Sequence, residues 1–127
     1  MIVEWVLPED LRAAGDARRH VADDLGARGV PDEVIDDLVL IASELAANAV
    51  RHGRPPALLR LEYVDGVIRI VVVNHGDALD PRVLTADPDA GHGRGLVMVE
   101  QLADEVGWSR DGERLAVWAQ VRDPRSR

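Results

Sequence analysis

The sequence contains no cysteine, no lysine and no phenylalanine, and it has a single tyrosine. Without cysteine the chain can form no disulfide bond, and it offers neither a thiol nucleophile nor a cysteine-ligated metal site. Without lysine it has neither the lysine of a P-loop nor an amine for Schiff-base chemistry. The scarcity of aromatic residues argues against a stacking platform for single-stranded nucleic acid.

Long hydrophobic runs are absent as well. No stretch approaches the roughly 18 apolar residues of a membrane span, and the start from Met1 to Trp5 lacks the basic, apolar character of a leader. We therefore expect a soluble, cytoplasmic protein. Acidic residues outnumber basic ones by 23 to 15, for a net charge of −8. This charge disfavours nucleic acid as a partner, because backbone binding needs a cationic surface.

The length and composition predict one globular domain over residues 1–127, since 46% of the residues are hydrophobic and 30% are charged. Hydrophobic periodicity and turn residues predict a series of elements along the chain. In order, they are a strand at 2–7, helices at 9–28 and 32–52, strands at 58–63 and 67–73, an irregular segment at 74–93, a helix at 95–106, strands at 108–110 and 115–121, and a frayed tail from about 122.

Hairpins that alternate with helices, without regular strand–helix–strand units, indicate an α+β fold. We predict a two-layer sandwich in which helices cover one face of a mixed, mostly antiparallel sheet. The two-residue turn at Asp65-Gly66 supports the first hairpin, because an Asp-Gly pair between alternating strands is a strong hairpin signal.

The polar side of the predicted helix 32–52 carries the most specific pattern. Glu44 and Asn48 are four residues apart, so their side chains lie one turn above the other. An amide oxygen can bind a hard cation such as Mg²⁺, and a carboxylate can accept a proton from an attacking hydroxyl group. The same two residues would also fit an ordinary solvated helix face.

Two further segments contain glycine at positions that favour a ligand. The segment Asn74-His75-Gly76 ends a strand of valines, and its glycine permits a close backbone approach. The run 91–96, Gly-His-Gly-Arg-Gly-Leu, opens a helix, where converging N–H groups and the helix dipole favour a phosphate. Alone, the first segment could be a simple turn and the second a flexible hinge.

In this order, the three segments resemble the histidine-kinase-like ATPases of the GHKL superfamily. The run from Ser43 to Gly53 resembles the N box of that family. The segment 74–76 falls at the family's first glycine box, and the run 91–96 falls at its second. The resemblance extends from about Trp5 to Val121, and within the superfamily the short chain is most similar to the anti-sigma-factor serine/threonine kinases.

This resemblance implies that the chain binds ATP with Mg²⁺. Glu44 would be the general base that activates the attacking group, and Asn48 would bind the Mg²⁺ that bridges the ATP phosphates. A lid over the nucleotide would span residues 77–90. The other residues that the resemblance assigns to nucleotide binding are Arg51, His52, Asn74, Gly76, Gly91, Gly93, Arg94, Gly95 and Leu96.

The resemblance also implies a protein kinase that phosphorylates a small antagonist protein, sequesters a sigma factor and forms a homodimer. The sequence departs from the family pattern at Asn74, which stands where an aspartate usually accepts a hydrogen bond from the adenine amino group, and it lacks the proline often found just after Gly76. An amide oxygen can accept that bond, but the loss of charge could cost about 1–3 kcal/mol. Two other functions therefore stay open: a catalytically degenerate protein-binding module of the same fold, and a nucleotide-binding accessory of a signalling system.

Overall fold

The computed structural model of the chain describes residues 1–75 and 93–126, with the side chains of residues 93–96 excepted. The elements in these residues are, in order, β1 (Ile2–Leu7), α1 (Arg12–Ala27), α2 (Asp32–His52), β2 (Arg54–Val64), β3 (Val67–His75), α4 (Gly93–Leu102), β4 (Glu105–Asp111) and β5 (Arg114–Arg122).

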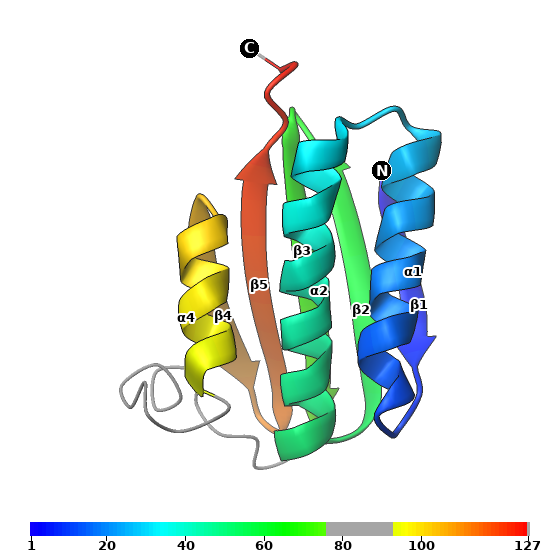
Figure 1. The fold of residues 1–127 in the computed structure, drawn as a ribbon. Helices are drawn as coiled ribbons and strands as arrows, with labels where there is room; N and C mark the ends of the chain where they lie inside the picture. The colour runs from blue at the N-terminus through cyan, green and yellow to red at the C-terminus, as the bar shows by residue number, and fades with distance from the viewer. Residues whose placement is uncertain (76–92, 127) are drawn as a thin grey trace.

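The strands form one sheet with the order β1-β2-β3-β5-β4. Helices α1, α2 and α4 lie side by side on one face of it (Figure 1). This arrangement confirms the predicted α+β sandwich. Every pairing between the described strands is antiparallel, so the parallel component that we expected in a mixed sheet does not occur among them.

The hydrophobic core lies between the helices and the sheet. Strand β3 buries Ile68, Ile70 and Val72 in it, and α2 buries a stripe that includes Leu38 and Leu45. The turn between β2 and β3 has positive φ angles at both central residues, 53° at Asp65 and 77° at Gly66, as the Asp-Gly pair predicts. None of the described helices is long and apolar enough to cross a bilayer.

The last predicted helix is wrong at its C-terminal end. Helix α4 stops at Leu102, and Val106 lies in strand β4, opposite Ala119 of β5. The spacing of Leu102 and Val106 continues a helical period, so the periodicity alone could not separate the two elements. Residues 105 and 106 pair with β5 instead of continuing the helix, and the backbone N–H of Asp104 donates a hydrogen bond to the carbonyl oxygen of Gln120 just before this pairing begins.

The tail is packed, where we expected fraying from about residue 122. Asp123 is completely buried and accepts hydrogen bonds from Arg125 and from the hydroxyl group of Tyr63. Arg125 also donates to the carbonyl oxygen of Gly29, at 2.6 Å. These contacts fasten the described tail to the start of the α1–α2 connection and to the end of β2.

Candidate functional site

The three segments that carry the sequence pattern meet at one end of the sandwich. Helix α2 ends there at His52, strand β3 ends there at His75, and α4 begins there at Gly93 (Figure 1). The cause is the direction of the chain, because α2 and β3 run toward this end and α4 runs away from it. Residues that are 40 to 50 positions apart in the sequence are thereby brought to one edge of the fold.

Asn48 has an unusual environment on α2. Its Oδ1 and Nδ2 are both buried, and neither has a hydrogen-bond partner among the described residues. Burial of an amide without a partner costs about 1–3 kcal/mol, so such a group calls for an explanation. Glu44, one turn earlier on the same helix, is half-buried. The pair thus offers a carboxylate and an unsatisfied carboxamide one helical turn apart on α2.

The donor set fits a hard cation only when a ligand completes it. Oxygen atoms of amides and carboxylates are the ligands that Mg²⁺ prefers, and Mg²⁺ usually takes the rest of its octahedral shell from phosphates and water. The described residues hold no group of three or more His, Asp or Glu that could bind a metal by themselves. The oxygen of Asn48 is therefore suited to a cation that arrives with a phosphate ligand.

Asn74 is buried where β3 reaches the last turn of α2. Its Nδ2 lies 3.3 Å from the carbonyl oxygen of Ala49 and donates to it. Because only the NH₂ group of an amide can donate, this contact orients the carboxamide and leaves Oδ1 as its acceptor. The role of Asn74 as an acceptor for adenine stays a prediction, and the hydrogen bond to Ala49 was not predicted.

Gly53 makes this contact possible. Its N–H also donates to the carbonyl oxygen of Ala49, at 2.9 Å. A Cβ atom at Gly53 would lie 1.8 Å from Nδ2 of Asn74 and 2.8 Å from that carbonyl oxygen. We expected Gly53 only to end the helix. A glycine immediately after the last helical residue was the available signal, but the sequence does not show which side chain occupies the space of its missing Cβ.

The remaining predicted residues divide into described and undescribed ones. Arg51 is exposed, whereas His52 is half-buried with its Nε2 covered. Gly76, Gly91 and the predicted lid lie outside the described residues. Four others, which the sequence placed in a phosphate-binding run, form the first turn of a helix that begins at 93 rather than 95. They are Gly93, Arg94, Gly95 and Leu96.

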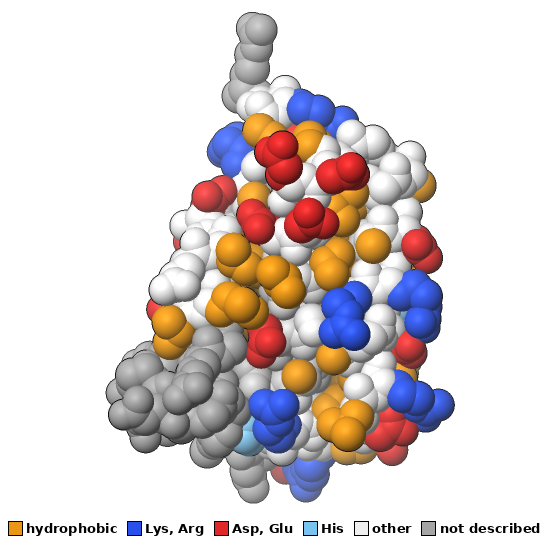
Figure 2. Space-filling model, in the orientation of Figure 1, with side chains coloured by type: hydrophobic (Ala, Val, Ile, Leu, Met, Phe, Trp, Pro, Cys, Tyr) orange, Lys and Arg blue, Asp and Glu red, His pale blue; other side chains and the backbone are white. Residues whose placement is uncertain are grey.

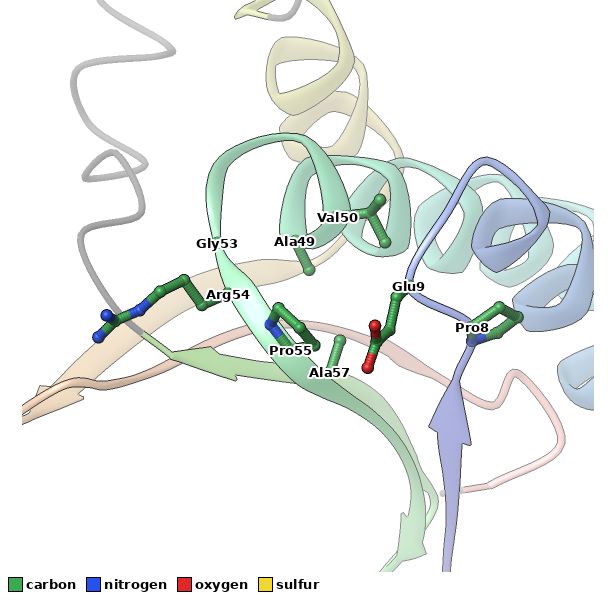
Figure 3. A pocket seen from close by; sticks show the side chains of 8 residues that line it. All are labelled: Pro8, Glu9, Ala49, Val50, Gly53, Arg54, Pro55 and Ala57. Atoms are coloured by element: carbon green, nitrogen blue, oxygen red, sulfur yellow. The ribbon is translucent and has the colours of Figure 1, made fainter.

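A small cavity lies against the last turn of α2. Ala49, Gly53 and Pro55 line it, and the carboxylate of Glu9 points toward Pro55, while Arg54 points away (Figure 3). Its volume of about 20 Å³ has room for a water molecule but not for a nucleotide. This cavity therefore belongs to the packing of the helix end.

A larger groove of about 210 Å³ lies between the start of α1 and the end of α2, and its walls include Leu11, Val50 and Arg51. Leu11 is 92% exposed at its rim. Neither this groove nor the small cavity contains Glu44 or Asn48.

Apolar side chains gather across the middle of the helical face between α2 and α4, whereas acidic side chains gather where α2 begins (Figure 2).

Comparison with solved structures supports the fold. The chain is similar to part of the structure of the RsbU and RsbW domains of Rv1364c from Mycobacterium tuberculosis, with a TM-score of 0.74 and 22% identity over 96% of this chain and 32% of that one. It is also similar to the SiaB–SiaC complex from Pseudomonas aeruginosa, with a TM-score of 0.70 and 14% identity over 94% of this chain and 88% of that one. The chain thus spans about a third of the first structure's length.

A third similar structure is the histidine kinase domain of the blue-light activated histidine kinase from Erythrobacter litoralis EL346. The TM-score is 0.58 and the identity is 19%, over 89% of this chain and 60% of that one. A family model described as the histidine kinase-like ATPase domain matches residues 7–121, which is almost the whole described fold. The chain belongs to the histidine kinase-like ATPase domain family.

Proposed function

We propose that the chain binds Mg²⁺–ATP at the end of the sandwich where α2, β3 and α4 meet. The buried carboxamide of Asn48, which has no partner among the described residues, carries this proposal. A ligated Mg²⁺ would satisfy its oxygen and remove the cost of burying it. The first turn of α4 supports the proposal, because backbone N–H groups at a helix start favour phosphate oxygens.

We further propose that the chain is a serine/threonine protein kinase. Glu44 would accept the proton from a serine or threonine hydroxyl group of a partner protein. As the proton leaves, the oxygen of that hydroxyl group would bond to the γ-phosphorus, and the bond from the γ-phosphorus to ADP would break. Asn48 would hold the Mg²⁺, which supplies charge neutralisation on the phosphates when it is bound. Asn74 would accept a hydrogen bond from the adenine amino group through Oδ1. Arg51 and His52 would contact or brace the phosphates.

The partners that we propose are a small antagonist protein as the phosphate acceptor and a sigma factor that is sequestered. One similar structure is a complex of SiaB with SiaC, and another contains an RsbU domain beside an RsbW domain. The SiaB–SiaC complex supports a second protein as the partner, and the RsbU and RsbW domains, which belong to one protein, support a second domain beside this fold. We also propose a homodimer, for which light scattering during gel filtration should give twice the chain mass of 13.9 kDa.

Asn74 favours a second candidate function. Its amide nitrogen donates a hydrogen bond to the carbonyl oxygen of Ala49, and its side chain brings no negative charge to the adenine. A chain that has lost tight nucleotide binding could keep the fold as a protein-binding module whose partners exchange by affinity alone.

The third alternative is a nucleotide-binding accessory of a signalling system. Such a protein would bind Mg²⁺–ATP without transferring its phosphate.

Calorimetric titration with ATP and Mg²⁺ tests the binding step. The wild-type protein should bind in the micromolar range, Asn48→Ala should lose most of the affinity, and Glu44→Gln should retain it. Glu33→Gln, in the exposed first turn of the same helix, is the matched control and should bind normally. A folded wild-type protein that gives no heat up to millimolar ATP would refute nucleotide binding and favour the protein-binding module.

Transfer of γ-labelled phosphate to candidate antagonist proteins tests the kinase step. The wild-type chain and Glu33→Gln should label the antagonist, and Glu44→Gln should not. Labelling by Glu44→Gln at the wild-type rate would exclude Glu44 as the base. Binding of Mg²⁺–ATP without labelling of any antagonist that forms a complex with the chain would instead support the accessory function.

A further inference from the structure

The contact between Asn74 and Ala49 joins two parts of the candidate site. Ala49 directly follows Asn48 on α2, and Asn74 stands at the end of β3. The carbonyl oxygen of Ala49 accepts two hydrogen bonds, from the N–H of Gly53 at 2.9 Å and from Nδ2 of Asn74 at 3.3 Å. The side chain of Asn74 thus links the turn of α2 that follows Asn48 to the end of β3 by a hydrogen bond.

We propose that Asn74 is a positioning residue whose amide donor ties the last turn of α2 to β3, so that the aspartate usual at this position in the family could not replace it in this chain. A carboxylate has the same shape as the amide but no hydrogen to donate. Placed here, it would set a negative oxygen against the carbonyl oxygen of Ala49, at a position that is 3% exposed. Burial of an unpaired charge beside an acceptor is strongly unfavourable.

The proposal predicts a chemical signature that distinguishes a missing donor from lost packing. A carboxylic acid, unlike a carboxylate, carries a hydrogen and could donate to Ala49. The Asn74→Asp variant should therefore be destabilised at pH 8 and recover as the pH falls and the acid form is populated. Asn74→Ala removes the donor at every pH, so its deficit relative to the wild-type protein should stay constant.

Other titratable and charged groups adjoin this contact and belong to the wild-type protein and all variants. His52 precedes Gly53 on α2, and His75 follows Asn74 on β3. Arg54 of β2 and Arg114 of β5 pair with His75 in register. Each variant is therefore compared with the wild-type protein at the same pH, so that the titration of these groups cancels.

Thermal unfolding of the full chain without nucleotide tests whether the hydrogen bond from Asn74 to Ala49 stabilises the fold. Asn74→Asp should lower the Tm by roughly 5–10 °C at pH 8, and by less at pH 5. A wild-type Tm for Asn74→Asp at pH 8, or a deficit that does not change with pH, would overturn the proposal. If Asn74→Asp does not fold at pH 8, its folding at pH 5 is the required outcome, and its failure there would also overturn the proposal.

Gly53→Ala offers an independent test with Asn74 in place. The added Cβ would displace the amide, so this variant should lose stability, and it should lose little more when Asn74→Ala is added. If the stability losses of the two single variants add up in the double variant, Gly53 and Asn74 act separately, and this result would count against the proposed link between α2 and β3.

The effect on ligand binding rests on the proposed function. At pH 8, Asn74→Asp should bind Mg²⁺–ATP at least tenfold more weakly than the wild-type protein, despite restoring the family's usual residue. Tighter binding by Asn74→Asp would overturn the proposal. The unfolding experiments contain no nucleotide, so they test whether Asn74 links α2 to β3 even if the wild-type protein binds no Mg²⁺–ATP. Failure of this proposal and failure of the proposed nucleotide binding are therefore distinguishable.

Discussion

Arg125 donates hydrogen bonds through Nε and Nη2 to the carboxylate of Asp123, which is completely buried, and thereby fastens the end of the chain to the fold. Tyr63, from the end of β2, donates its hydroxyl group to the same carboxylate. A third contact extends from Arg125 to the carbonyl oxygen of Gly29. One buried charge therefore organises groups from the tail, a strand and the connection between two helices.

Asp123→Ala should destabilise the domain substantially. The substitution leaves the hydroxyl group of Tyr63 without its acceptor. It also removes the carboxylate that Arg125 binds, and the side chain of Arg125, which is 46% exposed, keeps its bond to Gly29 and can turn partly to water. The expected loss is about 2–4 kcal/mol in the free energy of unfolding, measured with urea. Asp111→Ala, at the exposed end of β4, is the control and should change stability by less than about 0.5 kcal/mol. Equal effects of the two variants would contradict this account.

Asp123 should also make stability depend on pH in the acid range. The hydrogen bonds from Arg125 hold the pKa of the Asp123 carboxyl well below its usual range. The stabilisation is therefore fully present above the unfolded-state pKa of about 3.9 and is lost as the pH falls below it. In urea unfolding at pH 7, 4 and 3, the stability difference between wild type and Asp123→Asn should shrink at the lowest pH. A difference that stays constant would contradict the assignment.

Local sequence signals predicted the parts of the fold whose causes are local. The bounds of β1 and α2 agree with the sequence prediction, because a proline or a glycine follows each element and its apolar residues are regularly spaced. The Asp65-Gly66 turn likewise depends on two adjacent residues. The packed tail was missed because Asp123 is paired with Tyr63 and held near Gly29, at sequence separations that no local pattern records.

The same distinction applies to the candidate site. Glu44 and Asn48 could be paired from the sequence because helical spacing alone places them one turn apart. The lack of a partner for the Asn48 carboxamide could not be predicted, since it depends on what packs around α2. Nor could the sequence orient Asn74, because the direction of an amide is decided by its neighbours, here the carbonyl oxygen of Ala49.

Gly107→Ala should disturb the uncovered face of the sheet. A Cβ at this position would lie 2.1 Å from the indole of Trp118, which also packs 4.4 Å from the guanidinium carbon of Arg69. The ring would have to move, at an expected cost of about 1–3 kcal/mol in the free energy of unfolding. Near-ultraviolet circular dichroism should report the displaced tryptophan, and an unchanged spectrum with unchanged stability would refute the predicted clash.

Gly26→Ala should have the opposite effect on stability. Nothing lies within 4 Å of a Cβ built on Gly26, which is in α1, so the added methyl group meets no neighbour. Alanine has a higher helix propensity than glycine and restricts the unfolded chain, which predicts a gain of about 0.5–1 kcal/mol. Urea unfolding measures the gain. A loss of stability would mean that α1 needs glycine near its end for a reason other than space.

Asn48→Ala should separate stability from binding. In the absence of ligand both polar atoms of Asn48 are buried without a partner among the described residues, so their removal should leave the free energy of unfolding unchanged or raise it by up to about 1 kcal/mol. The same substitution should abolish the increase in Tm that Mg²⁺–ATP gives to the wild-type protein. Asn74→Ala is the contrasting control, because it removes an amide that donates to Ala49 and should destabilise the free protein. A loss of several kcal/mol in ligand-free Asn48→Ala would show that its carboxamide serves the fold rather than a ligand.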